Sequence, residues 1–243
     1  MGGLGPNNPR QIGDFDILGV VHSDAISVTY AALGPAGQRV AVTQIRSPYS
    51  EDDGVRSAFR DETAAREQLS DARIAPVVDA APEADHPWIV RERPFGTSLR
   101  KIIDTIGPLP APVVLRLAAE LAEALAEMHQ RGMLHRDLSP SNVLISPDGV
   151  RLIDFGAASG PVDGPLVLGT PGYLAPEQII GRPAVPAGDV FSLGSVMLMA
   201  ATGRDPFEAS DHAVTLYKVL NEEVDLTDLP TTLRTIVERA LAK

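Results

Sequence analysis

The sequence predicts an α+β fold, with strands in the first part of the chain and helices in the second. Between residues 15 and 45, β-branched side chains surround a Gly-Pro-Ala-Gly turn at residues 34–37, which is typical of antiparallel strands. Beyond residue 110, apolar side chains recur at every third or fourth position, as they do along the buried face of a helix. The 243 residues are enough for one large or two small domains.

A helix, two strands and a linker are predicted after the first strands. Residues 57–69 carry good helix formers with glutamate and arginine interleaved, which predicts one exposed helix. Residues 77–78 and 88–90 indicate two short strands on either side of a turn. The Arg-Pro-Phe-Gly sequence at residues 93–96 breaks this pattern, so we expect a linker there.

Three helices are predicted in the second part of the chain. Residues 112–130 present one apolar face, which indicates a largely buried helix that Gly132 closes. Residues 189–202 are apolar almost all round, as expected of a helix in the middle of a larger unit, and Gly203 is its stop signal. Residues 231–242 form the last predicted helix.

A stretch between the two long helices carries three polar side chains that suit a nucleotide phosphate: Asp137, Asn142 and Asp154. Apolar runs at residues 143–145 and 150–153 flank a Pro-Asp-Gly turn, which predicts two strands that hold the two acidic loops together. This arrangement suits phosphoryl transfer, because one carboxylate takes the proton of the acceptor hydroxyl while an Asp and an Asn hold magnesium on the phosphates.

Short motifs accompany these residues. They are His135-Arg136-Asp137, Asp154-Phe155-Gly156 and Ala175-Pro176-Glu177, together with longer segments at residues 87–90, 169–173 and 189–194. The short motifs resemble the protein-kinase signature set, and the longer segments are similar to those of bacterial, especially actinobacterial, Ser/Thr kinases. The resemblance covers most of the chain. It implies a two-lobed protein-kinase-like fold, in which a small antiparallel β lobe with one helix precedes a larger, mainly α lobe.

The resemblance also sets the expected domain boundaries. We expect a flexible tail at residues 1–10, the small lobe at 11–92, a hinge at 93–97 and the large lobe at 98–243. The end of the chain, Ala-Leu-Ala-Lys, resembles the start of a family segment that continues with Asp-Pro and an arginine. We therefore expect the large lobe to be truncated at its C-terminal end, so that Glu177 lacks its arginine partner.

Composition excludes several classes of partner. The net charge is −11 and nothing offers a basic stripe, so we expect no nucleic acid and no membrane contact. The absence of cysteine excludes disulfides and thiolate metal sites. The first ten residues lack the pattern of a secretory signal, and the longest apolar run is far shorter than the roughly 20 residues that span a bilayer. We expect a cytoplasmic protein.

The chain departs from the family pattern where the phosphates bind. The lysine of the third strand, which holds the phosphates in the family, is replaced by Thr43, and no lysine precedes Lys101. The lost contact is worth about 1.5–3 kcal/mol. Of the glycines in the phosphate-covering loop only Gly19 remains, and Ser139 stands where Ser/Thr kinases carry the lysine that steadies the γ-phosphate.

The adenine side departs from the pattern as well. The match at residues 87–90 puts Arg91 at the gatekeeper position, where a buried guanidinium needs a partner. The same register puts Glu92 at the hinge carbonyl and Pro94 where a backbone N–H should donate to the ring, although proline has none. Loss of two phosphate contacts and one hinge bond weakens ATP binding by about 10³–10⁵.

The resemblance identifies Glu62 as the helix glutamate whose lysine partner has become Thr43. Two cations are candidates for the vacant role. Arg66 lies one turn along the same helix, and Arg91 lies beside the helix in the family. We expect Arg91 to pair with Glu62, because its guanidinium could bind the carboxylate with two parallel hydrogen bonds.

The activation segment of the family corresponds to residues 156–176. Its serine and threonine residues are Ser159 and Thr170. Thr170 matches the threonine that lies near the catalytic aspartate in the family, and Ser159 is the remaining candidate for phosphorylation.

The departures predict a pseudokinase, that is, a scaffold or regulator that binds a protein partner and holds no cofactor tightly. The alternative is an active Ser/Thr protein kinase acting on a protein substrate. In that case Asp137 is the base, Asn142 and Asp154 hold the magnesium of Mg-ATP, and an arginine takes over the lysine role. A phosphotransferase of the aminoglycoside type shares the His-x-Asp loop, but the Ala-Pro-Glu motif and the segment at Asp189 favour a protein kinase.

Overall fold

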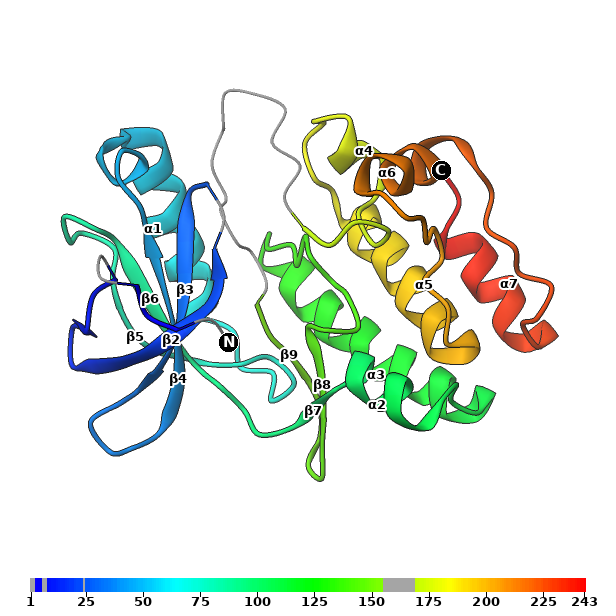
Figure 1. Ribbon diagram of the computed structural model, residues 1–243, viewed down its shortest axis with the longest axis horizontal. Helices are drawn as coiled ribbons and strands as arrows, with labels where there is room; N and C mark the ends of the chain where they lie inside the picture. The colour runs from blue at the N-terminus through cyan, green and yellow to red at the C-terminus, as the bar shows by residue number, and fades with distance from the viewer. Residues whose placement is uncertain (1–2, 6–7, 24, 155–168) are drawn as a thin grey trace. The chain divides into compact units, whose positions relative to one another are not determined.

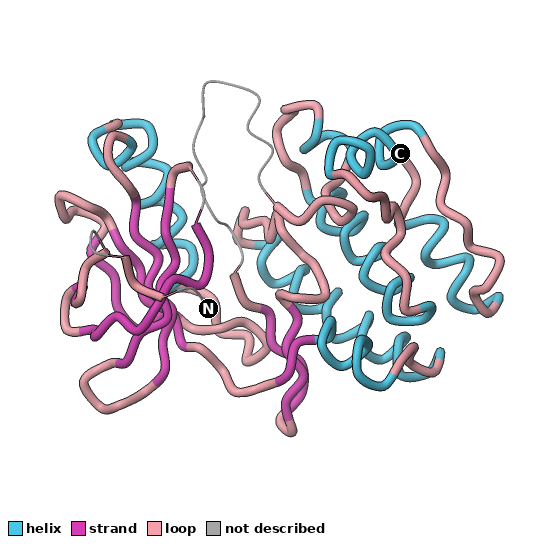
Figure 2. The backbone as a smooth tube through the Cα atoms, viewed as in Figure 1, coloured by secondary structure: helices cyan, strands magenta, loops and turns pink. Residues whose placement is uncertain are grey.

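The structure is a computed structural model, and it describes residues 3–5, 8–23, 25–154 and 169–243. They form two compact units, of which the first ends at Pro94 and the second begins at Phe95 (Figure 1). This division falls inside the segment predicted as a hinge. Figure 2 shows that the first unit is rich in strands and the second in helices, which confirms the predicted α+β class.

The first unit is built on a six-stranded antiparallel sheet in the order β1-β2-β3-β4-β6-β5. The strands are β1 (Gln11–Ile12), β2 (Phe15–Ser23), β3 (Ser27–Leu33), β4 (Arg39–Ile45), β5 (Val77–Ala81) and β6 (Trp88–Glu92). Alternate residues along each strand face the same side. One face therefore gathers a buried core that includes Phe15, Tyr30, Val42 and Val90, with Trp88 packed edge-on against Phe15.

The helix of this unit, α1 (Asp53–Glu67), begins four residues before its predicted start. A short 3₁₀ turn, η1 (Tyr49–Glu51), leads into it. The carboxylate of Asp52 accepts a hydrogen bond of 2.9 Å from the N–H of Val55, so Asp52 caps the first turn. The sequence contains a signal for this helix start, since aspartate is a preferred N-cap. Gly54 follows it, however, and glycine has a low helix propensity, so the predicted start was placed later.

Part of the segment predicted as a loose tail packs on the sheet. Leu4 lies against the apolar core. Asn8 accepts a hydrogen bond of 2.7 Å from the N–H of Gly5 and donates one of 3.5 Å to the hydroxyl of Tyr30. These contacts differ from the flexible tail that the sequence led us to expect at residues 1–10, because Leu4 buries apolar surface and Asn8 bonds to a residue 22 positions away.

The second unit is mainly helical and carries a small antiparallel sheet. The helices are α2 (Leu99–Ile106), α3 (Ala111–Gln130), α4 (Pro176–Ile179), α5 (Pro186–Thr202), α6 (His212–Asn221) and α7 (Thr231–Ala240), and the strands are β7 (Thr97–Ser98), β8 (Val143–Ser146) and β9 (Gly149–Leu152). Helix α5 is buried along most of its length and packs against α3 and α7. It ends at Gly203, whose φ of 73° is in the left-handed region that closes helices.

The three predicted helices of this unit and the predicted hairpin are present, whereas α2, α4 and α6 were not predicted. Each of these is short, so its apolar spacing gives little signal. In the part of the chain that the structure describes, no helix is long and apolar enough to cross a membrane.

Candidate active site

The loop at residues 135–142 in the second unit brings together Asp137, Asn142 and Thr170. One oxygen of the Asp137 carboxylate accepts hydrogen bonds from the N–H and the hydroxyl of Thr170, at 2.8 and 2.7 Å. The other accepts from the side-chain amide of Asn142 at 2.9 Å, and that amide also donates to the backbone oxygen of Asp137. The expected proximity of Thr170 to this aspartate is therefore confirmed.

The buried carboxylate of Asp189, in α5, holds the start of this loop. It accepts hydrogen bonds of 2.8 Å each from the ring of His129 and from the N–H groups of His135 and Arg136. Arg136 has a φ of 66°, an uncommon value for a residue other than glycine, and these bonds fix it there. Burial opposes ionisation of Asp189, but the His129 ring, the nearby ring of His135 and the two backbone donors outweigh it and lower the pKa of the carboxyl group.

The hairpin of β8 and β9 connects Asn142 to the region of Asp154. Val143 pairs with Leu152, and the N–H of Ile153 donates to the backbone oxygen of Asn142 at 3.0 Å. Asp154 follows with a φ of 54°, again in the left-handed region. The structure therefore fixes the backbone at both sequence-predicted magnesium residues. Phe155, Gly156 and Ser159 lie outside the described residues.

Ser139, at the position of the catalytic-loop lysine, is completely buried. Its backbone oxygen accepts from the N–H of Asn142, which tightens the loop. Its hydroxyl has no hydrogen-bond partner within the described part of the chain. A small buried hydroxyl offers neither the charge nor the reach of a lysine ammonium group.

In the first unit, Thr43 belongs to a buried polar cluster on the face of the sheet opposite the apolar core. Its hydroxyl shares a hydrogen bond of 3.0 Å with that of Thr29 and accepts one of 3.1 Å from the guanidinium of Arg91. The register pairs Ala41 with Arg91, so Arg91 and Thr43 are diagonal neighbours on one face. Arg91 is 5% exposed, and Thr43 is one of the partners that its burial requires.

Glu62 pairs with Arg66, not with Arg91, so our expectation of a Glu62–Arg91 pair is wrong. The Glu62 carboxylate accepts from Nε of Arg66 at 2.9 Å and also from its Nη2. Both side chains are largely buried, at 15% and 5% exposure. The physical reason is distance along the helix: residues four apart lie one turn from each other, so Arg66 reaches the carboxylate without leaving α1.

The remaining predicted site residues lie on strands or in the linker. Gly19 lies in β2 opposite Ala31, between two register irregularities of this strand, and β2 stays paired as far as Ser23. Glu92 is exposed, and its N–H donates to the backbone oxygen of Pro76. Pro94 ends the first unit and has no N–H to offer a ring nitrogen. None of these three positions adds a positively charged side chain.

A second polar network fastens the segment that contains the Ala-Pro-Glu motif. The guanidinium of Arg100, in α2, binds both oxygens of Asp205, and the Tyr173 hydroxyl also donates to Asp205. Burial and the bond to Asp205 raise the pKa of Tyr173 well above its usual value. Sequence reasoning missed this network, because Arg100 lies 73 and 105 positions from its partners. Glu177 is partly exposed and forms no ion pair within the described residues.

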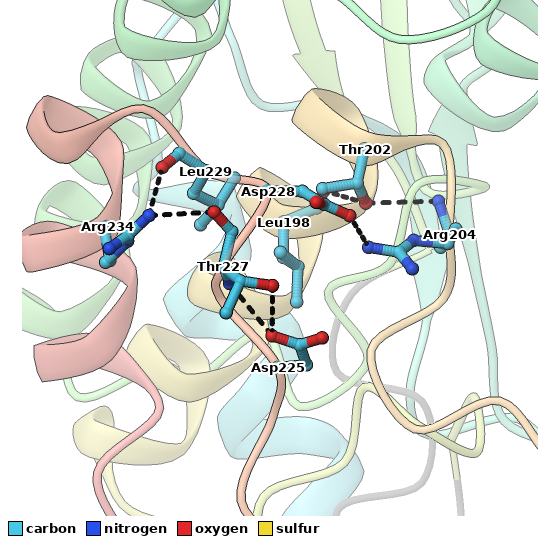
Figure 3. A network of polar contacts seen from close by, with 8 residues as sticks. All are labelled: Leu198, Thr202, Arg204, Asp225, Thr227, Asp228, Leu229 and Arg234. Atoms are coloured by element: carbon cyan, nitrogen blue, oxygen red, sulfur yellow. Dashed lines mark hydrogen bonds and ion pairs between the residues drawn. The ribbon is translucent and has the colours of Figure 1, made fainter.

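A cavity of about 220 Å³ lies at the end of α5, beside the loops that flank α6. Figure 3 shows the polar contacts around it. Arg204 pairs with Asp228 at 2.5 Å, and Asp225 accepts from the N–H and the hydroxyl of Thr227. Arg234, from α7, donates to the backbone oxygens of Thr227 and Leu229. No sequence-predicted site residue lines this cavity. Among its lining residues, Arg204 and Asp225 bond to the loop before α7, and Asp205 belongs to the network with Arg100 and Tyr173.

Comparison with known proteins points to the protein kinases. The model of the protein kinase domain family matches residues 25–240. The chain is 41% identical over 244 residues to the serine/threonine-protein kinase AfsK of Streptomyces coelicolor, covering 98% of the chain and 30% of the relative. It is 38% identical to the probable serine/threonine-protein kinase PkwA of Thermomonospora curvata, with 96% and 32% covered. It is 33% identical to PknL of Mycobacterium tuberculosis, with 84% and 53% covered. The chain thus spans about a third of the length of the first two relatives.

Proposed function

Because the chain belongs to the protein kinase family and its relatives are bacterial serine/threonine kinases, we propose that it is a pseudokinase domain that binds a protein partner. The observation that carries this proposal is the environment of Thr43. The position that holds the phosphates in the family bears a buried hydroxyl, bonded to Thr29 and Arg91. The glutamate that would pair with the lysine is already bound to Arg66.

The residues present fit Mg-ATP poorly. Asn142 and Asp154 are the side chains that would hold magnesium, and magnesium would neutralise charge on the phosphates. The adenine and phosphate contacts around them are reduced. Thr43 and Ser139 lack the ammonium group of the family's lysines, and Pro94 lacks a backbone N–H. A loss of about 4–7 kcal/mol follows if two phosphate contacts and one hinge bond are missing.

The preserved loop around Asp137 is compatible with a structural role. Asp137 uses both carboxylate oxygens to hold Thr170 and Asn142, and Asp189 holds the backbone before it. Removing any of these groups would leave partly buried donors without acceptors, which destabilises a fold whether or not it catalyses a reaction. A domain that serves as a binding surface needs this rigidity.

An active Ser/Thr protein kinase is the second candidate, and two observations favour it. The side chains of Asp137 and Asn142 lie 2.9 Å apart, which is compatible with roles as a base and a magnesium ligand. The guanidinium of Arg91 lies 3.1 Å from the Thr43 hydroxyl, so a cation remains beside the lysine position. Under this alternative, Arg91 contacts the phosphates, Asp137 accepts the proton, and the substrate is a protein.

A thermal-shift titration with Mg-ATP distinguishes the two candidates. A ligand at 100 times its Kd stabilises the folded state by about 2.7 kcal/mol, which gives a clear rise in Tm. We expect no rise at millimolar Mg-ATP and no phosphate transfer to a generic protein substrate. The matched control is Asp154→Asn. A rise in Tm that this substitution abolishes, together with transfer that Asp137→Ala abolishes, would establish the active kinase instead.

A further inference from the structure

The attachment of α1 to its sheet differs from the one that the family uses. In the family, the strand lysine and the helix glutamate form a link between β4 and α1, next to the bound phosphates. Here the Glu62 carboxylate is neutralised inside the helix by Arg66. The side chain at the lysine position, Thr43, bonds to Thr29 and Arg91. The lysine–glutamate link is therefore absent: position 43 has no lysine, and Glu62 is bound to Arg66.

Arg56, in the second turn of α1, provides a different attachment. Its Nη1 donates to the backbone oxygens of Ser50 at 2.9 Å and of Ala84 at 3.0 Å. Its Nη2 donates to the backbone oxygen of Glu83 at 3.2 Å. One partly buried guanidinium thus joins the helix to η1 and to the turn between β5 and β6. Charged donors make the stronger class of hydrogen bond, and a planar guanidinium serves several acceptors at once.

The surrounding contacts hold the same two segments together. His86, in the turn, lies 3.1 Å from the hydroxyl of the buried Ser50. Arg60 pairs with Glu83 one helical turn beyond Arg56, but both of these side chains are largely exposed, at 46% and 67%. An exposed pair of this kind is screened by solvent and contributes little. Of these two arginines, Arg56 therefore makes the stronger contact between α1 and the turn.

We infer that Arg56 is a positioning residue that holds α1 on the sheet whether or not a nucleotide is bound. The inference rests on the proposed function, because a domain that binds a partner without a nucleotide needs a nucleotide-independent means of fixing this helix. All the acceptors of Arg56 are backbone oxygens of the first unit. None of them is a group that a nucleotide would displace or neutralise.

Amide hydrogen exchange of the full chain tests the inference, with and without Mg-ATP. In Arg56→Met we expect the amides of the first half of α1 to exchange about tenfold faster than in the wild type, while those of β3 and β4 change less than about twofold. The matched control is Arg60→Met, which removes an arginine of the same helix; it should change α1 exchange by less than about twofold. Mg-ATP should leave α1 exchange in the wild type unchanged.

Arg56→Lys keeps the charge but replaces the wide planar guanidinium with a single ammonium nitrogen, which cannot occupy the positions of both Nη1 and Nη2. It should therefore accelerate α1 exchange to an intermediate extent, and it remains informative where Arg56→Met does not fold. Equal exchange in Arg56→Met and Arg60→Met would overturn the inference, and so would protection of α1 by Mg-ATP in the wild type. Phosphate transfer by the wild type, with α1 still loosened only by Arg56 substitutions, would refute the pseudokinase proposal and leave the attachment standing.

Discussion

Thr43 and Arg91 lie close enough that a lysine at position 43 would meet a buried guanidinium. We predict that Thr43→Lys alone destabilises the protein by about 2 kcal/mol, because it adds a second cation to a buried cluster. We also predict no robust phosphate transfer, since Pro94 and Ser139 obstruct nucleotide use independently. Denaturant unfolding and phosphorylation of a generic substrate are the measurements.

Two further variants complete that experiment. Thr43→Lys combined with Arg91→Met should recover most of the lost stability, because it leaves one cation on this face of the sheet. Asp137→Ala is the control for contaminating kinases. Strong transfer by the single variant, absent from its Asp137→Ala counterpart, would mean that position 43 alone accounts for the loss of activity.

Tyr173 gives the fold a dependence on alkaline pH. Burial and the bond to Asp205 raise the pKa of its phenol in the folded state, whereas the unfolded chain releases this proton near pH 10. The neutral phenol therefore contributes stability below about pH 10, and this contribution is lost as the pH rises further. We predict that Tyr173→Phe lowers Tm at pH 8 but flattens its decline between pH 9 and about 11. Tyr217→Phe, at a 60% exposed position, should leave the decline unchanged.

At the scale of an element, α1 contains a largely buried ion pair of its own. We predict that Arg66→Met costs about 3 kcal/mol in the free energy of unfolding, because the Glu62 carboxylate is left with no cation in a mostly buried position. The double variant Glu62→Gln with Arg66→Met should recover much of that loss. Chemical denaturation of the two single variants and the double variant measures the coupling. Additive costs would indicate that the pair contributes nothing.

At the scale of the whole molecule, the two units offer separate spectroscopic signals. The single tryptophan of the chain, Trp88, packs against Phe15 in the first unit, whereas most helices belong to the second. The first unit is the smaller and buries less surface, so it should be the less stable. We predict that tryptophan fluorescence changes at a lower denaturant concentration than far-UV circular dichroism. Coincident curves would show that the two units unfold as one.

Much of the fold was predictable because it depends on local patterns. The β-branched residues of the strands, the apolar spacing of the long helices and the Pro-Asp-Gly turn each appear within a few residues of sequence. The short helices α2 and α6 were missed for the same reason, since eight or ten residues give too few repeats of the apolar spacing. The packing of Leu4 on the sheet has no local signal at all.

The sequence by itself determined the family, the grouping of Asp137, Asn142 and Asp154 around one hairpin, and the loss of the lysine at position 43, because each depends on residue identity at fixed spacing. Only the tertiary structure decided which partners the charged groups choose. Glu62 pairs with Arg66, Arg91 binds Thr43, and Arg56 reaches a turn 27 residues away. A long, flexible arginine reaches several acceptors at similar cost, so its choice depends on which of them folding brings within hydrogen-bonding distance.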